Sequence, residues 1–289
     1  MFRTGGRPRI TGAYLEVLDP ATGQKFRLLR SRAVRAPPNA IPAPPFPRDL
    51  EWVNVAPLRM DKQRGRPVLI EFWDFCRVNS LRTLPYLIAW HERYAERGLR
   101  VIGIHTGGFE VSREEANVRR AVERLGVPYP VVVDSRLELW DIYGNEGWPA
   151  RYLWDTGGAL FSMHYGEGAY QETEREIQEL LGIDEEPLAP MRPEDAPGAL
   201  LPAQTEDQRG AYNGPYKAGG VWAVLEGEGE ITVNGRAVAV DEPGCYSLIE
   251  HPHHTAGVLE LAVGAGVTCH ATCFTPGVAA PGAPGRPAA

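Results

Sequence analysis

The sequence predicts two domains, an α/β domain with a mixed sheet followed by an all-β domain of the jelly-roll or β-sandwich type. Between residues 67 and 181, buried apolar strands alternate with segments of helical spacing. After residue 206 the hydrophobic period changes to two, and turn residues divide the short runs. A proline-rich, acidic stretch at 185–206 separates the two patterns, so we expect it to be an interdomain linker.

The α/β domain is expected over residues 45–184. Its first strand, 68–73, is a continuous apolar run that suits the centre of a sheet covered on both faces. A helix of apolar period then runs on to a stop at Gly98. The remaining expected elements are strands at 101–104 and 131–133, a helix at 116–125, a hairpin of 151–154 with 159–163, and a closing helix at 172–181.

Short strands are also expected on either side of this domain. Residues 1–44 read as a β extension, with strands at 13–18 and 25–29 about a turn at 19–23, followed by a proline-rich connector that begins at 36. The all-β domain is expected over 207–275, and the Pro/Gly/Ala tail at 276–289 is expected to be disordered. The expected strands of the all-β domain are 221–225, 230–233, 236–240, 246–249, 258–263 and 267–274, with a type I′ turn signal at Asn234-Gly235.

The composition excludes several classes of function. The formal net charge is −7, which disfavours binding to nucleic acid, and the basic cluster of Arg3, Arg7 and Arg9 is short. No run reaches the roughly 20 apolar residues of a membrane helix, and no secretory signal core is seen. We therefore expect a cytoplasmic protein without membrane insertion. The 4 cysteines are too few for a disulfide scaffold, and no cofactor is indicated.

The segment that follows the first strand carries a recognisable motif. Phe72 to Pro85 reads FWDFCRVNSLRTLP. This run resembles the thioredoxin-like domains of the TlpA and DipZ type, in the redoxin superfamily, which carry a tryptophan-ended strand, then Cys-Ile-Asn-Cys, one residue, and Arg-Thr-Leu-Pro. Counting from Trp73 forward and from Pro85 backward gives one register. In that register the two family cysteines fall on Arg77 and Ser80, and Asn79 still matches.

Further matches to the same family continue through the α/β domain. They imply a thioredoxin fold, membership of the thiol-disulfide oxidoreductases that serve cell redox homeostasis, and relatives that often work outside the cytoplasm. The all-β domain also resembles the sandwich that follows the thioredoxin module in DipZ-like proteins. The matching segments are 89–94, 103–106, 116–120, 148–150 and 166–168.

The two substitutions bear directly on chemistry. At a thioredoxin-type site the attacking cysteine lies at a helix N-terminus, where free N–H groups and the helix dipole lower its pKa, and the second cysteine resolves the mixed disulfide. Arg77 is no nucleophile, and its charge is unfavourable at that end of a helix. Ser80 cannot resolve a disulfide. We therefore predict a degenerate site without dithiol exchange, and a role in binding a protein or peptide; whether the chain is an enzyme stays open.

Cys76 keeps an enzymatic alternative open. It lies one residue before the family's nucleophile position, beside Arg77, whose charge would lower a thiol pKa. It would then act as a monothiol disulfide reductase or an antioxidant peroxidase. Against this, a shift of one residue on an extended segment turns the side chain to the opposite face, so we favour a small buried residue.

A binding groove is implied by the resemblance. Trp148-Pro149 matches the family's cis-proline, which lies opposite the active-site loop and exposes backbone that can pair with an extended peptide. The alternative is that this turn only shapes the fold. The residues expected along the groove are Trp73, Asn79, Trp148 and Pro149.

Histidines and cysteines elsewhere suggest weaker sites. His91 and His105 are expected to be structural, because no metal-ligand spacing surrounds them. In the all-β domain a metal or cupin-like role rests on His251, His253 and His254, with Cys269, His270 and Cys273 downstream. The histidine and glutamate motif that cupins carry before the hairpin at Asn234-Gly235 is absent. A carbohydrate-binding role, with Trp222 and Tyr246 stacking on a sugar, is a further alternative to their being core residues.

Overall fold

The structure, a computed structural model, describes residues 14–18, 25–29, 34–35 and 41–280. The expected basic cluster at Arg3, Arg7 and Arg9, the turn at 19–23 and the start of the proline-rich connector lie outside these residues. The two strands expected about that turn pair as predicted: β1 (Tyr14–Leu18) lies antiparallel to β2 (Lys25–Leu29).

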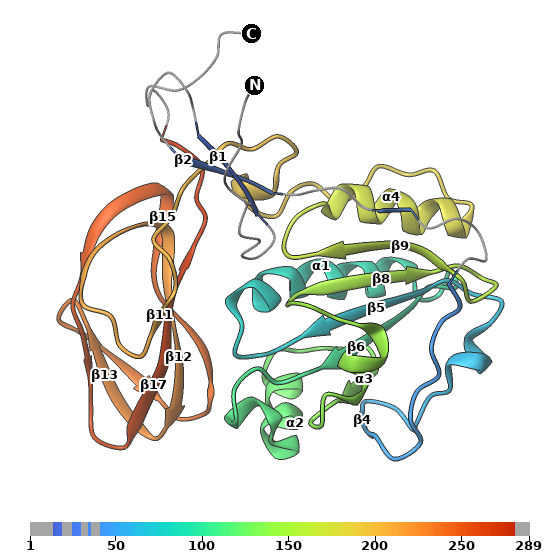
Figure 1. The fold of residues 1–289 in the computed structure, drawn as a ribbon, viewed down its shortest axis with the longest axis horizontal. Helices are drawn as coiled ribbons and strands as arrows, with labels where there is room; N and C mark the ends of the chain where they lie inside the picture. The colour runs from blue at the N-terminus through green and yellow to red at the C-terminus, as the bar shows by residue number, and fades with distance from the viewer. Residues whose placement is uncertain (1–13, 19–24, 30–33, 36–40, 281–289) are drawn as a thin grey trace, which may run out of the picture.

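A seven-stranded mixed sheet forms the α/β domain, in the order β3-β9-β8-β5-β6-β7-β4 (Figure 1). The central strand β5 is wholly buried, and it pairs in parallel with β6 and antiparallel with β8, which confirms the expected mixed direction. The strands are β3 (Val34–Arg35), β4 (Glu51–Val53), β5 (Val68–Trp73), β6 (Arg100–His105), β7 (Val131–Val133), β8 (Ala150–Trp154) and β9 (Leu160–Tyr165).

Helices cover both faces of this sheet, as the continuous apolar character of β5 requires. One face packs against α1 (Val78–Tyr94), α2 (Glu115–Arg124) and α4 (Tyr170–Leu181) through a single apolar cluster. The other face packs against α3 (Glu138–Tyr143) and the chain around residues 46–60. The sequence did not predict α3 or the edge strand β4, which are 6 and 3 residues long.

The all-β part consists of two antiparallel sheets that share one apolar core, β11-β17-β12-β15 and β14-β13-β16; we call it the β domain. Its strands are longer than predicted: β12 has 14 residues and β15 has 16, and β15 takes in the start of the expected strand at 258–263. The bounds are β11 (Gln208–Arg209), β12 (Gly214–Gly227), β13 (Gly229–Val233), β14 (Arg236–Val240), β15 (Gly244–Leu259), β16 (Leu261–Val263) and β17 (Val267–Thr275).

The stretch at 185–206 packs against the α/β domain in its first part, and its last residues contact β2 and the β domain. Glu185 forms ion pairs with Arg93 and Arg97 on and after α1. Farther along, the Tyr86 hydroxyl donates to Asp195 at 2.9 Å, beside the short 3-10 helix η3 (Pro193–Asp195). The strand β10 (Leu201–Pro202) then pairs with β2. The proline-rich stretch at 185–206 therefore runs along the protein surface.

The C-terminal tail does not leave the β domain at the expected residue. Pro276 and Gly277 are buried, and the backbone N–H of His254 donates to the Val278 carbonyl at 2.8 Å. The expectation of disorder from 276 onward is therefore wrong for these first residues. Residues 281–289 lie outside the described part.

The β domain stands beside one end of the mixed sheet (Figure 1). The four-stranded sheet of the β domain contributes Val224 and Cys273 to the apolar cluster that α1 shares with the mixed sheet. A second contact joins α2 to the β domain, through ion pairs from Arg120 and Arg124 to Glu242. Two cores are thereby joined at the amino end of α1.

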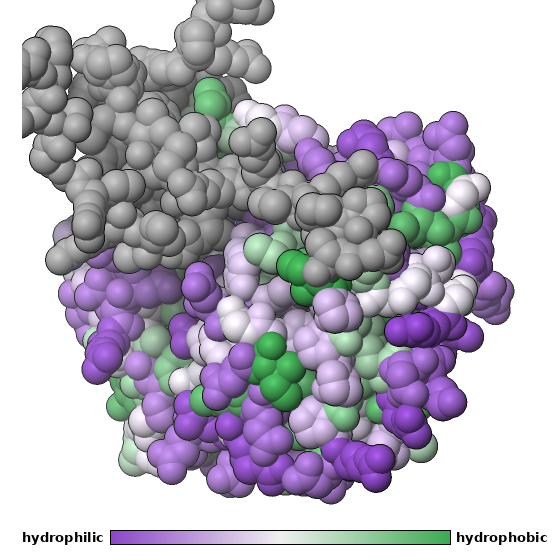
Figure 2. All heavy atoms as spheres, turned by 45° about the vertical axis from the view of Figure 1, so that its right-hand side comes forward, coloured by the Kyte–Doolittle hydropathy of each residue, from purple (hydrophilic) through white to green (hydrophobic). Residues whose placement is uncertain are grey.

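Much of the coloured surface in Figure 2 is hydrophilic. On the face drawn in Figure 2, hydrophobic residues stand singly or in small groups among polar ones. Isolated apolar residues of this kind are normal on folded proteins. Within the described residues, no helix is both long and apolar enough to traverse a membrane. The exposed large hydrophobic residues are Ile41, Ile142, Met191, Leu200 and Val258.

Candidate functional site

Helix α1 begins where the sequence register places it. The strand β5 ends at Trp73, and Arg77 is the N-cap residue of the helix, with extended backbone angles of φ −115° and ψ 116°. No side chain caps this end, and its first turn holds no acidic residue. Ser80, three residues in, is buried, and its Oγ accepts the backbone N–H of Asp74 at 3.2 Å. A guanidinium thus lies at the helix start, as predicted.

Asp74 organises the loop between β5 and α1. Its Oδ1 accepts the backbone N–H of Cys76 and its Oδ2 accepts that of Gly108, both at 2.8 Å. The carboxylate is fully buried, so desolvation raises its pKa, while these two N–H bonds act in the opposite direction. The loop therefore has one fixed geometry, tied to the segment that follows β6.

Cys76 points into the protein interior. It has 0% exposed surface and belongs to the apolar cluster beneath α1. Burial raises the pKa of its thiol far above the ordinary value, the neighbouring Asp74 raises it further, and Arg77 lowers it only partly. His105 lies near the same loop; its Nε2 accepts the Phe75 N–H at 3.2 Å, and burial lowers its pKa to about 3, so it is neutral.

Arg77 is held between two aromatic rings. Its guanidinium carbon is 5.0 Å from the centre of the Phe109 ring and 4.7 Å from that of Trp148. Gly108 lies so close that a Cβ there would be 2.6 Å from Arg77 Nη2. The side chain is nevertheless 40% exposed, and its Nε is 3.9 Å from Asp74 Oδ2. Stacking, close packing and one weak ion pair fix this guanidinium in place.

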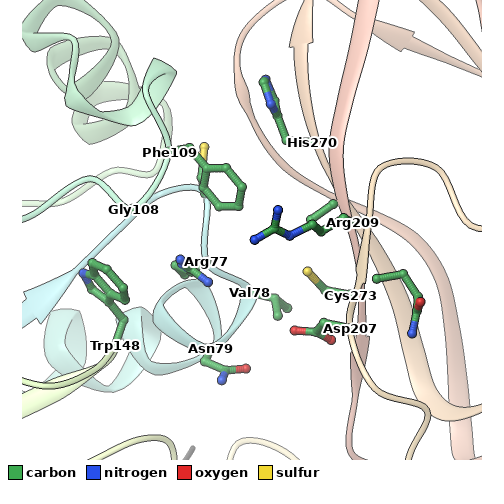
Figure 3. Close-up of a pocket in the computed structure, with 13 residues that line it drawn as sticks. Arg77, Val78, Asn79, Gly108, Phe109, Trp148, Asp207, Arg209, His270 and Cys273 are labelled. Atoms are coloured by element: carbon green, nitrogen blue, oxygen red, sulfur yellow. The ribbon is translucent and has the colours of Figure 1, made fainter. Parts of the chain in front are cut away.

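The exposed side of Arg77 faces a cavity of about 540 Å³ between the two domains (Figure 3). The α/β wall comes from the start of α1, the loop after β6 and Trp148. The β-domain wall comes from β11 and β17, whose register places Arg209 opposite Ala271. The lining residues are Cys76, Arg77, Val78, Asn79, Gly108, Phe109, Trp148, Asp207, Gln208, Arg209, His270, Ala271 and Cys273.

The structure brings together only part of the expected groove. Asn79 and Trp148 line the cavity, and the Trp148–Pro149 peptide bond is cis, as predicted. The Trp148 indole N–H donates to the Thr106 carbonyl at 2.9 Å. Trp73 is absent from the lining: it is 1% exposed and packs edge-on against His105. Pro149 is likewise not among the lining residues; its carbonyl accepts the Gly166 N–H.

His251, His253 and His254 lie on the strand β15, which continues through the gap between the strands expected at 246–249 and 258–263. His251 Nε2 is 2.8 Å from the Tyr216 hydroxyl, and the two rings stack. The described residues contain no group of three or more His, Cys, Asp or Glu side chains arranged to hold a metal ion. His270 is 2.7 Å from Glu226 and packs against Phe109 across the cavity.

The remaining expected β-domain residues divide between separate clusters. Cys273 and Trp222 pack toward the α/β domain, whereas Cys269 and Tyr246 pack toward the core of the β domain. Trp222 and Tyr246 therefore do not form one stacking platform. Cys76, Cys245, Cys269 and Cys273 are all free thiols.

Several cavity residues were not among the expected groove residues, and they include Gly108, Phe109, Asp207, Arg209 and His270. Of these five, only His270 carried any signal in the sequence. Asp207 and Arg209 stand just after the expected linker, at the start of the expected all-β domain, and nothing in their spacing shows that they face Arg77.

Comparison with known proteins shows which proteins this chain is similar to. No protein-family profile matches the chain. Among curated proteins, "Protein DipZ" of Mycobacterium tuberculosis is 32% identical over 163 residues, which are 53% of this chain and 24% of that protein. "Thiol-disulfide oxidoreductase YkuV" of Bacillus subtilis is 24% identical over 50% of this chain and 97% of its own length. The chain has thioredoxin-like thiol-disulfide oxidoreductases as its homologues.

The homology reaches about half of the chain. The chain in turn spans only about a quarter of the DipZ proteins that it matches, with 24% of their length covered. Among solved structures, a thiol-disulfide isomerase from Corynebacterium glutamicum matches 49% of this chain and 98% of its own, with 23% identity and a TM-score of 0.44.

Proposed function

We propose that this protein is a thioredoxin-like binding protein that does not carry out dithiol exchange, and that its ligand occupies the interdomain cavity. The observation that carries the proposal is the position of Arg77. A stacked guanidinium stands at the start of α1, and the neighbouring Cys76, although it is among the lining residues, has 0% exposed surface. A guanidinium group binds anions and neutral acceptors, and it does not attack a disulfide.

The surrounding residues support binding over electron transfer. Ser80 is buried and serves as a hydrogen-bond acceptor for the loop, so the second family position is also structural. The cavity volume of about 540 Å³ falls within the range of roughly 300 to 1,000 Å³ that small-molecule sites occupy. For a peptide, the Trp148 backbone beside the cis-proline is the expected point of attachment.

The alternative of a monothiol reductase or peroxidase at Cys76 finds less support. A reactive cysteine needs a thiolate and access to its substrate. Cys76 has 0% exposure, and burial raises its pKa. Neither condition is met in this conformation.

Restoring the two cysteines tests the proposal. The wild-type protein and the Arg77→Cys/Ser80→Cys variant are equilibrated with glutathione buffers and assayed for reduction of hydroxyethyl disulfide, with disulfides located by mass spectrometry. We expect turnover and a disulfide between the two introduced cysteines in the variant only. Wild-type turnover that Cys76→Ser abolishes would overturn the proposal. So would a double variant that stays inactive, because the two side chains would then not be the cause of the loss.

A further inference from the structure

Two guanidinium groups from different domains converge on the interdomain cavity. Arg77 approaches from the start of α1, and Arg209 extends from β11 toward it across the cavity (Figure 3). The Arg77 side chain is 40% exposed and Arg209 is exposed, so water screens their mutual repulsion, and an anion that enters the cavity can contact both groups.

Among the described residues, the carboxylates near these two guanidinium groups are those of Asp74 and Asp207. Arg77 has one weak contact, at 3.9 Å, with the buried Asp74. Within the described ranges, the Arg209 side chain forms no ion pair or hydrogen bond. Asp207 also lines the cavity, and its Oδ1 accepts the backbone N–H of Phe274 at 3.0 Å. His270 is bound to Glu226 at 2.7 Å. Two guanidinium groups and one carboxylate, that of Asp207, thus line the cavity, and the carboxylate of Asp74 lies behind Arg77.

The cavity walls add apolar surface beside this charge. Phe109 and Trp148 hold Arg77 through their ring faces, and the Phe109 ring also packs against His270, with ring centres 5.9 Å apart. Val78 and Cys273 contribute aliphatic and sulfur surface. Small-ligand sites have this composition, in which apolar walls surround a few convergent polar groups.

We propose that the interdomain cavity binds a small organic carboxylate, with the carboxylate group between Arg77 and Arg209 and the apolar body against the aromatic walls. The planar guanidinium is the side chain best suited to bind a carboxylate through two parallel hydrogen bonds. The inference rests on the proposed binding function of this cavity and names its ligand class. Both domains contribute a residue, so the site exists only in the full chain.

Phenylacetate and its neutral amide provide a matched pair of probes. The full-length protein is titrated with phenylacetate, phenylacetamide, inorganic phosphate and a short peptide that ends in phenylalanine, and binding is followed by ligand-observed NMR. We expect saturable binding of phenylacetate and at least tenfold weaker binding of the amide, since a hydrogen bond to a charged group contributes about 1.5 to 3 kcal/mol.

Arg209→Gln tests the role of the β domain. Because the Arg209 side chain makes no hydrogen bond to another described residue, this variant should fold normally. A thermal melt checks this expectation. We expect phenylacetate binding to fall at least tenfold in the variant. Lys217→Gln removes the same charge from an exposed position on β12 and should leave binding unchanged.

Several results would overturn the assignment. They are equal affinity for acid and amide, an unchanged affinity in Arg209→Gln, and the absence of saturable phenylacetate binding up to its solubility limit. Tighter binding of phosphate would replace the carboxylate by a different anion. Binding of the peptide but not of phenylacetate would assign the site to a chain terminus. None of these outcomes bears on disulfide exchange, so the redox test remains independent.

Discussion

The loop between β5 and α1 has an interior side and a cavity side, and different forces hold each. On the interior side, Cys76 lies in an apolar cluster, and Asp74 accepts its N–H at 2.8 Å. On the cavity side, the next residue, Arg77, is stacked between two rings and partly exposed. The comparison shows that two neighbouring residues of one loop can be held by different forces: buried hydrogen bonds fix the backbone on the interior side, while ring stacking positions the charged group on the cavity side.

The largest effect is expected from removing the interior anchor. Asp74→Ala leaves the N–H groups of Cys76 and Gly108 without an acceptor, and we expect the free energy of unfolding to fall by about 3 kcal/mol. Asp155 is a matched control, because its Oδ1 also accepts two backbone N–H groups, but in a more accessible turn. Asp155→Ala should cost about 1 kcal/mol. Urea denaturation measures both, and equal losses would contradict the interior role of Asp74.

A second effect concerns Glu71, a buried acid on the central strand β5. Glu71 on β5 is fully buried, its nearest cation is Arg151 at 4.0 Å, and burial raises its pKa to about 8. Because the folded state then keeps a proton that the unfolded state has lost, stability should fall as pH rises from about 4.5 to 8, by at most about 1.4 kcal/mol per pH unit.

Glu71→Gln should remove this slope while leaving the protein folded, since the amide cannot ionise. Denaturation at a series of pH values between 5 and 8 measures the change. A slope that is the same in both proteins would mean that Glu71 is ionised in the folded state and that another group titrates.

The smallest effect on stability, and the most specific one for the cavity side, is expected from Gly108→Ala. The added Cβ would lie 2.6 Å from Arg77 Nη2, the far end of a flexible side chain, so the guanidinium must move. We expect a stability change below about 1 kcal/mol together with clearly weaker phenylacetate binding. Gly147→Ala is the control, because nothing lies within 4 Å of a Cβ there. Unchanged binding in Gly108→Ala would show that the position of Arg77 is not required.

The sequence predicted the central strands, the helix register and the cis-proline, because each rests on local patterning or on a motif. A buried run fixes β5, and a fixed count between Trp73 and Pro85 fixes Arg77 as the residue at the helix start. The groove was predicted less well. Trp73 sits in the interior, because the last residue of a strand can turn to either face, and no local pattern decides which.

The β-domain wall of the cavity was out of reach of the sequence for a different reason. Arg77 and Arg209 are far apart in the sequence, and Arg209 faces Arg77 only because the two domains pack together. That packing depends on scattered residues such as Val224 and Cys273, which look like ordinary strand positions. The short elements α3 and β4 were missed because they are too brief to show a period.

The most direct test of the central claim is the alkylation rate of each cysteine in the native protein, followed by mass spectrometry with iodoacetamide from pH 6 to 9. We predict that Cys76 is labelled far more slowly in the folded protein than after unfolding, at every pH in this range, since it is buried and its pKa is raised. Rapid labelling of Cys76 at neutral pH in the folded protein would contradict the account, because a sulfur would then be available where we place only a guanidinium.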